Sequence, residues 1–547
     1  MTIAPESAAL SAAAHEGNGP AAPSSTLDDG GLSLPTSELM AHGGDARITL
    51  DEASGLNSYG CAPKPMPAIT YASSTASTVS SGAFAQTRAF HHQLRQAAKT
   101  TPPARVYAEA MADAHRRLCI LYGLDPSSDI AFGPSGTDLE YLANAVALAS
   151  GQSVRNIVVE VDEVGSGCLH AQKAHYFAPR TALGLEVETG TPVPGFGAER
   201  LGVAERLGVE TITIRNPDGS LRDPAEREAA LADMMDRSVA AGERPLLHVI
   251  HRSKTGLIAP EPQSLHRLSE RFGDRIDIVV DACQGRISPE MLRDYLDMGA
   301  IVFVTGSKFI GGPPFSAFAI MPERLGNRMR TGCAPKGLGG FFARGEMPAA
   351  WAAMDGVLPE VPNFGLLLRL ECGIFELSRL LAYPEEVVRK AIVSFGEAVR
   401  SVPDHATLRL LPGTEAQGED DLHPLDRTML HTFELAATHP VSGRPLSIDD
   451  ARAVYHMLYT DMSEHFKSAE ERIIAAETCH VGQPVRCARG ADGEWLPTLR
   501  LSLSAPHISE VGGLDDQALL RRFVTDLDWI CTKIRLVLPL LPAENPA

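Results

Sequence analysis

A single lysine stands in the stretch VFVTGSKFIGGPPFSAFAI, residues 302–320, which is otherwise apolar or small. Lys308 follows a Thr-Gly-Ser turn and precedes Gly-Gly-Pro-Pro, so the pattern predicts a lysine at the end of a buried strand. A lysine at a strand end usually points into water. A partly desolvated lysine gives up its proton more readily and can attack carbonyl carbons as a nucleophile. Taken alone, Lys308 is compatible with both interpretations.

A second stretch, AFGPSGTDLEYL at residues 131–142, predicts a strand that runs into a helix through Ser135, Gly136 and Thr137. Amide groups at a helix N-terminus bind phosphate, and glycine lets the backbone approach the phosphate oxygens closely. An ordinary helix cap, with Ser135 or Thr137 as the cap and Glu140 completing a capping box, fits the same residues equally well.

An acid follows another apolar strand in IDIVVDACQGR, residues 276–286. Asp281 is suited to bind a metal, to cap a helix or to face a positively charged ring nitrogen. A further strand, in HVIHRSKTGLIAP at residues 248–260, also ends in a polar turn. Because ligands of open α/β sheets bind at the carboxyl ends of the strands, we expect Asp281 and Lys308 at the same sheet edge.

A phosphate turn, a strand-end acid and a buried lysine are together what pyridoxal phosphate requires. The motifs GPSGTD, VDACQG, TGSK and HRSKTGLIAP resemble those of the fold-type-I pyridoxal-phosphate enzymes. The resemblance is to the aminotransferase class V branch, which includes cysteine desulfurases and kynureninases, and it covers residues 130–320. It implies a Lys308 aldimine, a ring-nitrogen contact from Asp281 and a phenolic-oxygen contact from Gln284. It also implies a phosphate site made by Ser135, Gly136, Thr137, Thr305 and Ser307.

The function implied by the resemblance is that of an enzyme acting on an amino acid, by transamination or by Cα/Cβ lyase chemistry. It also implies a homodimer with its sites at the subunit interface. Arg500 lies among leucines in WLPTLRLSLSAPHI and, by the same resemblance, binds the substrate carboxylate. A place on the wet face of an edge strand is the alternative for this arginine. Two other functions stay open, namely a cysteine desulfurase-like activity and a catalytically degenerate binding protein, although Lys308 and Asp281 favour an enzyme.

The sequence departs from the family pattern in two places. The strand after the phosphate helix ends in VVEVDEVGSGCLH, without an aromatic residue or histidine in the turn, so that Val164 or His170 would have to cover the cofactor ring. A desulfurase also needs a reactive cysteine on a loop. Cys333 in RTGCAPKGLGG fits best, beside Arg330 and Lys336, but an inert loop cysteine is the more common case.

Short apolar runs alternate with helical patterns through the first two thirds of the chain, which predicts a mainly parallel sheet covered on both faces. We expect an α/β, pyridoxal-phosphate-transferase-like large domain and a smaller α+β domain at the C-terminus. The expected division is a disordered tail at 1–45, an N-terminal segment at 46–74, the large domain at 75–365 and the small domain at 366–547. The repeated GAERLGVAERLGVE at 197–210 is expected to be a solvated insertion.

The composition of the chain argues against several classes of binding partner. A net charge of -19 argues against binding to nucleic acid or to an anionic membrane. No stretch approaches the roughly 18 apolar residues that span a bilayer. The nine cysteines have no framework spacing, and the N-terminus lacks the features of a signal peptide, so we expect a cytoplasmic protein without a metal site.

Overall fold

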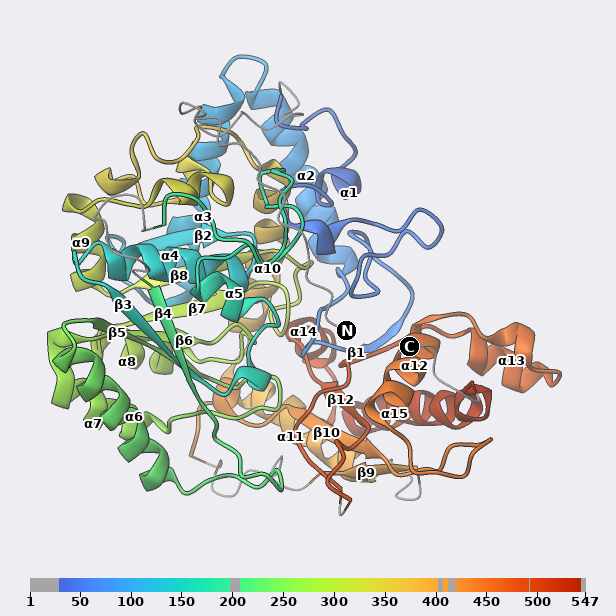
Figure 1. The fold of residues 1–547 in the computed structure, drawn as a ribbon. Coiled ribbons are helices and arrows are strands. Elements are labelled where there is room, and N and C mark those ends of the chain that lie inside the picture. The colour runs from blue at the N-terminus through green and yellow to red at the C-terminus, as the bar shows by residue number, and fades with distance from the viewer. Residues whose placement is uncertain are drawn as a thin grey trace, which may run out of the picture.

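The computed structural model describes residues 29–196, 207–401, 407–411, 419, 421–490 and 492–542. A seven-stranded sheet forms the centre of its larger part, with the strand order β2-β8-β7-β6-β5-β3-β4 (Figure 1). Strand β8 runs antiparallel to both of its neighbours, and all other pairs are parallel. The strands are β2 (Asp129–Gly133), β3 (Val154–Val159), β4 (Leu207–Ile212), β5 (Arg244–Ile250), β6 (Asp277–Asp281), β7 (Ala300–Thr305) and β8 (Ala317–Met321). The predicted α/β fold with a mainly parallel sheet is confirmed.

Helices cover both faces of this sheet because its strands are apolar on both sides. In β7, Ile301 and Phe303 belong to one hydrophobic core, whereas Val302 and Val304 belong to the other. The first core is closed by α4 (Gly136–Leu148) and α9 (Glu323–Thr331). The second is closed by α3 (Pro103–Tyr122), α6 (Pro224–Ala240), α7 (Pro262–Phe272), α8 (Pro289–Asp297) and α10 (Phe364–Leu381). The short α5 (Cys168–Gln172) packs against α4.

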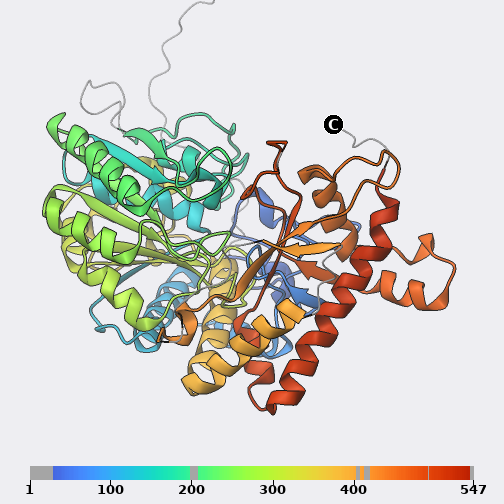
Figure 2. The ribbon, with the colours of Figure 1, turned by 90° about the horizontal axis from the view of Figure 1, so that it is seen from below.

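The C-terminal part contains a separate antiparallel sheet with the order β12-β10-β9. Its strands are β9 (Leu408–Leu410), β10 (Leu430–Leu435) and β12 (Thr498–Ser502). The long helices α11 (Glu385–Ser401) and α15 (Asp516–Val537) pack against each other beside it (Figure 2). The remaining helices of this part are α12 (Ile448–Tyr459), α13 (Ala469–Ala476) and α14 (Ala505–Val511). Strand β1 (Ile69–Tyr71) pairs in parallel with β11 (Cys479–Val481) and so attaches the N-terminal segment here.

The expected disordered tail only partly lies within the described residues, since 1–28 fall outside them. Residues 29–45 are packed rather than disordered, and Leu39 and Met40 are buried there. Helix α1 (Thr36–Leu39) contacts α10 and α2 (Ser81–Ala97), and Arg369 of α10 donates hydrogen bonds to the carbonyl oxygens of Met40 and Gly43. These contacts come from residues far away in the sequence, which is why local composition did not indicate them.

The expected insertion at 197–210 also differs from the structure. Residues 197–206 lie outside the described part of the chain, but Leu207–Ile212 form the edge strand β4. The alternation of this segment is weak because β4 is bound on one side only, by β3. The other domain boundaries expected from the sequence stay predictions.

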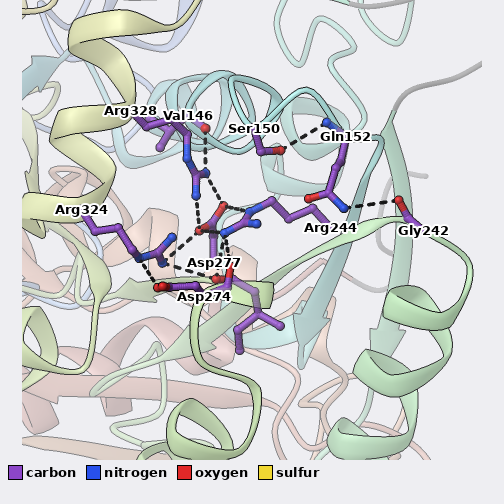
Figure 3. Close-up of polar contacts among 10 residues, drawn as sticks. Val146, Ser150, Gln152, Gly242, Arg244, Asp274, Asp277, Arg324 and Arg328 are labelled. Atoms are coloured by element: carbon purple, nitrogen blue, oxygen red, sulfur yellow. Dashed lines mark hydrogen bonds and ion pairs between the residues drawn. The ribbon is translucent and has the colours of Figure 1, made fainter.

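A buried charge cluster fixes the start of strand β6 (Figure 3). The carboxylate of Asp277 is fully buried and accepts hydrogen bonds from Arg244, at 2.8 Å, and from Arg328, at 2.6 Å. Arg324 adds a third contact at 3.1 Å. Burial alone would raise the pKa of Asp277, but the hydrogen bonds from Arg244 and Arg328 outweigh it and hold the pKa below its ordinary value. The cluster therefore anchors the strand whose opposite end carries Asp281.

Candidate functional site

The loops that follow β6 and β7 run side by side at the carboxyl edge of the main sheet. The Thr305 hydroxyl donates to the Cys283 carbonyl oxygen at 2.7 Å, and the Phe309 amide donates to the Gln284 carbonyl oxygen at 3.2 Å. Because both strands are parallel and adjacent, their ends bring the acid of one loop to the lysine of the other. The structure thus places Asp281 and Lys308 on the same edge of one sheet.

Lys308 lies in the turn directly after β7 and is partly exposed. Its amine makes no hydrogen bond or ion pair with the residues that the structure describes, although the next residue, Phe309, is fully buried. The backbone around it is held firmly, since Ser77 donates to the carbonyl oxygens of both Ser307 and Lys308. A fixed backbone with an uncommitted amine suits a nucleophile better than a surface charge.

Asp281 ends β6 and is half-buried. Its Oδ1 atom accepts a hydrogen bond from the Cys283 amide at 2.9 Å. That bond closes a local turn, and the Cys283 thiol also interacts with the Asp281 carboxylate. The described ranges contain no group of three or more metal-ligating side chains. The three roles expected for Asp281 stay predictions.

The N-terminus of α4 reaches the same edge. A Cβ atom on Gly136 would lie 2.5 Å from the Cys283 sulfur and 3.9 Å from the Thr305 methyl carbon, so only glycine permits this approach. Thr137 is buried, and its hydroxyl lies 3.9 Å from the Cys168 sulfur. The predicted phosphate turn is thereby brought to the loops that carry Asp281 and Lys308.

Ser135 is the N-cap of α4, and its hydroxyl accepts the Asp138 amide at 3.2 Å while donating to Asp138 Oδ2 at 2.5 Å. The expected capping box with Glu140 is wrong, because Glu140 accepts instead from Gln172 Nε2 at 3.1 Å. Burial, and then the charge of Asp45, raise the pKa of Asp138 to about 7. This acid of the phosphate turn is consequently largely protonated below neutral pH, which reduces its repulsion of an anion.

Gln284 is buried but committed to protein partners. Its Nε2 donates to the Ser74 carbonyl oxygen at 3.2 Å, and its Oε1 accepts from Arg286 Nη1 at 2.7 Å. The resemblance implied that Gln284 contacts the phenolic oxygen of the cofactor. To do so, Gln284 would have to give up one of these two bonds. Thr305 is likewise committed to Cys283, whereas the Ser307 hydroxyl has no protein partner in the described part of the chain.

Residues 73–77, with the sequence SSTAS, cross the site and were missed by sequence reasoning. We call them the serine strap. The strap contacts the Lys308 turn through Ser77, Gln284 through Ser74, and β12 through Ser73, whose hydroxyl lies 3.0 Å from the Ser502 hydroxyl. The Ser74 hydroxyl is buried without a partner. The serine strap is a run of small, mostly polar residues without a periodic pattern, so nothing in the sequence indicated these contacts.

Arg500 lies on β12 and is completely buried. It donates to the carbonyl oxygens of Gln483, at 2.9 Å, and Lys254, at 2.8 Å, and to the Thr75 hydroxyl at 3.1 Å. The alternative of a wet edge-strand face is thus wrong for this side chain. Burial lowers the pKa of Arg500 to about 10, and nearby acidic groups only partly offset it. The side chain joins the small sheet to the strap and to the turn after β5.

A second lysine accompanies Lys308 and was not singled out from the sequence. Lys254 Nζ donates to the Asp162 carbonyl oxygen at 3.3 Å and has no carboxylate partner in the described ranges. Burial, and then the positive charges of Arg500 and Lys308, lower the pKa of Lys254. Its turn is clamped by buried Glu163, which accepts from the Ser253 hydroxyl and the Thr255 amide. Lys254 stood in the quoted stretch HRSKTG, but its neighbours only became known with the fold.

The two candidates for covering a cofactor ring differ in position. Val164 is buried, and a Cβ atom on the following Gly165 would lie 3.3 Å from the Thr137 hydroxyl. His170, in contrast, is exposed. The structure therefore favours Val164 of these two.

The cysteines near the site are buried thiols. Burial and the Asp281 carboxylate raise the pKa of Cys283 well above its ordinary value, and burial also raises that of Cys168. Cys333 is exposed, but a Cβ atom on the preceding Gly332 would touch Ala149, at the C-terminal end of α4. Since α4 has 13 residues, that end lies about 20 Å from the phosphate turn. Within one subunit, Cys333 is thus remote from Lys308.

None of the helices in the described ranges combines the length and apolar character needed to span a bilayer. No protein-family model matches the chain. No curated protein matches it in sequence.

Solved structures do resemble the chain. The apo cysteine desulfurase from Thermococcus onnurineus NA1 superposes with a TM-score of 0.50 at 14% sequence identity, over 84% of this chain and 94% of that one. The Escherichia coli cysteine desulfurase CsdA gives a TM-score of 0.47 at 14% identity, over 85% of this chain and 94% of the other. A mutant of C-DES with glycine covalently linked to its pyridoxal-phosphate cofactor gives 0.47 at 13% identity, over 84% and 96%. The likeness to the Thermococcus protein shows a common fold.

Proposed function

We propose that this chain is a pyridoxal-phosphate-dependent enzyme of the aminotransferase class V type that acts on an amino acid. One observation carries the proposal. The Lys308 amine after β7 has no partner among the described residues, and it lies at the same sheet edge as the Asp281 carboxylate after β6 and the N-terminus of α4, which begins with Gly136. Pyridoxal phosphate supplies an aldehyde that condenses with amines and a ring that accepts electrons.

The donor set fits this cofactor. Lys308 offers the amine for the aldehyde, Asp281 a carboxylate for the protonated ring nitrogen, and the α4 amides with Ser307 a phosphate site. The Ser74 hydroxyl is buried without a protein partner, and Gly136 allows the N-terminus of α4 to approach the loop that carries Asp281. The fully engaged Gln284 side chain fits less directly, because it would have to exchange a partner.

Four parts of the chain have distinct roles in this proposal. Lys308, once its amine is free, takes the substrate α-proton and returns it as general base and acid. Arg500 binds the substrate α-carboxylate through its fork of donors, for which it exchanges at least one of its bonds to Gln483, Lys254 and Thr75. Val164 shields the ring, and the serine strap excludes water from the Lys308 turn. The reaction is transamination or Cα/Cβ bond cleavage.

The proposal includes a homodimer in the cytoplasm. The nine cysteines of the sequence have no framework spacing, which supports a reducing compartment. Light scattering on the purified protein measures the subunit number directly, and a monomer at micromolar concentration would contradict the dimer.

Absorbance spectroscopy tests the function. We expect added pyridoxal phosphate to give a visible band that borohydride removes, with the label on the Lys308 peptide in mass spectrometry. Lys308→Ala should lose the band and all turnover, whereas Lys99→Ala, at an exposed lysine, should keep both. A protein that stays colourless, or a Lys308→Ala variant with full activity, would refute the proposal.

A further inference from the structure

A cavity of about 240 Å³ lies between the turn after β5 and the start of β10. Three arginine side chains line it, Arg252, Arg286 and Arg427, together with Thr255 and Thr428. At about 30 Å³ for each water molecule, it holds roughly eight waters. It is therefore large enough for a small ion with part of its hydration shell.

Arg286 is the unusual member of this group. It is only 2% exposed, yet no carboxylate lies within 4 Å of its guanidinium in the described part of the chain. Its Nη1 and Nη2 donate to Gln284 Oε1, at 2.7 Å, and to the Ser73 hydroxyl, at 2.6 Å, but its Nε is buried without a partner. Buried charges in proteins are otherwise paired, because an unpaired one is costly.

Two further charged residues near the cavity, Arg252 and Asp426, do not pair with Arg286. Arg252 forms an ion pair with Glu419 at 3.2 Å, and its Nε is also buried without a partner. The Asp426 carboxylate accepts the Ser288 amide at 2.9 Å instead of binding an arginine side chain. Burial, and then the positive charges of Arg500 and Arg252, lower the pKa of Arg286 to about 9.

We propose that this cavity binds a small oxyanion, of the carboxylate or phosphate class, with Arg286 as its principal ligand and Arg252 as the second. A guanidinium group matches the planar fork of a carboxylate and the edge of a phosphate, and its Nε–H is one half of that fork. The oxyanion is either a free ion or the acidic group of a larger molecule. The site stands on its own residues and does not require that Lys308 hold a cofactor.

Occupancy of the cavity is connected to the candidate active site by the serine strap. Arg286 binds Ser73 at one end of the strap, and Arg500 binds Thr75 two residues further on. The same strap contacts the Lys308 carbonyl oxygen through Ser77 at 2.7 Å. Binding of an anion at Arg286 therefore orders the segment that closes the Lys308 turn.

Calorimetric titration with sodium phosphate and with sodium malonate, at constant ionic strength set by sodium chloride, tests the site on the full chain preincubated with pyridoxal phosphate. We expect one saturable site per chain whose affinity falls at least tenfold in Arg286→Met. Arg275→Met removes the same charge at an exposed position before β6 and should bind as the wild type does. Because Arg286→Met deletes a buried unpaired charge, its melting temperature should be unchanged or higher. Binding that is independent of Arg286 would overturn the proposal.

Crystals soaked in selenate give a second test that needs no variant. An anomalous peak beside Arg286 Nε supports the site, and its absence at concentrations that saturate the titration refutes it. Displacement of malonate from the wild type by an acidic amino acid would identify the oxyanion as the acidic group of a larger molecule. Binding that amino acids do not displace would identify a free ion. Failure of the Lys308 tests leaves all these readouts intact.

Discussion

Gly136 and Cys283 lie in contact across the candidate site, so that no side chain fits at position 136. A Cβ atom there would be 2.5 Å from the Cys283 sulfur but 3.5 Å from its Cβ atom, which is an ordinary contact distance. The sulfur alone thus sets how closely the N-terminus of α4 approaches the loop after β6, and with it the distance between the proposed phosphate site and Asp281.

Gly136→Ala should push these two elements apart. We expect a loss of about 1–3 kcal/mol in the free energy of unfolding, as for other overpacked sites, and at least tenfold weaker binding of pyridoxal phosphate. The double variant Gly136→Ala/Cys283→Ala should recover most of both, because it removes the sulfur that clashes. Gly513→Ala is the matched control, since its Cβ atom would meet open space. A double variant as impaired as Gly136→Ala would contradict this account.

Asp138→Asn should change how stability depends on pH. The pKa of Asp138 is raised from 3.8 to about 7, so the folded protein keeps a proton that the unfolded chain loses above pH 4. Stability therefore falls as pH rises from about 4 to 7 and levels off above that range. Asp138→Asn has no carboxyl group to ionise, so its free energy of unfolding does not fall in this way. Relative to the wild type, it should rise by at most about 1.4 kcal/mol per pH unit between pH 4 and 7.

Urea denaturation at several pH values measures this effect. Asp297→Asn, at an exposed aspartate, serves as the control. Parallel pH profiles for Asp138→Asn and the wild type would show that the carboxyl group ionises normally.

Arg500→Gln should weaken amino-acid binding through the lost carboxylate contact. We expect a cost of about 2–5 kcal/mol in substrate binding, measured by titration of the cofactor band. The matched probe is the amine that lacks the α-carboxylate, which should bind the variant as well as it binds the wild type. Equal losses for amino acid and amine would assign Arg500 a purely structural role, in keeping with its bonds to Gln483, Lys254 and Thr75.

Asp277→Asn should be among the most destabilising polar substitutions, because it leaves buried Arg244 and partly buried Arg328 without their carboxylate. The expected cost is about 3–5 kcal/mol. Since the folded pKa of Asp277 is depressed, the wild-type advantage should persist above pH 3.8 and vanish only as pH falls through that depressed pKa. Asp274→Asn, at an exposed acid whose carboxylate pairs with Arg324, should cost under about 1 kcal/mol. Similar costs for both variants would contradict the burial argument.

The expected strands at the carboxyl edge correspond closely to the structure, because each is a short apolar run between turn residues. The runs that end at Gly133, Asp281 and Thr305 became β2, β6 and β7. In the stretch WLPTLRLSLSAPHI, the apolar alternation corresponds to β12. The sequence-based expectations were wrong where residues are ordered by partners far away in the sequence. Residues 29–45 and the edge strand β4 are the two examples.

By itself, the sequence determined the α/β fold and the order of its chemical groups, since apolar periodicity and turn residues act over a few neighbouring positions. Lys308, Asp281 and Gly136 could be singled out in this way as candidate site residues, a role that stays a prediction. Only the tertiary structure decided which groups are free and which are engaged. It turned Gln284 toward Ser74 and Arg286, buried Arg500 against three partners, laid the serine strap across the site and left Arg286 unpaired beside a cavity. Desolvation and hydrogen bonding depend on residues hundreds of positions apart, and local patterns in the chain do not record them.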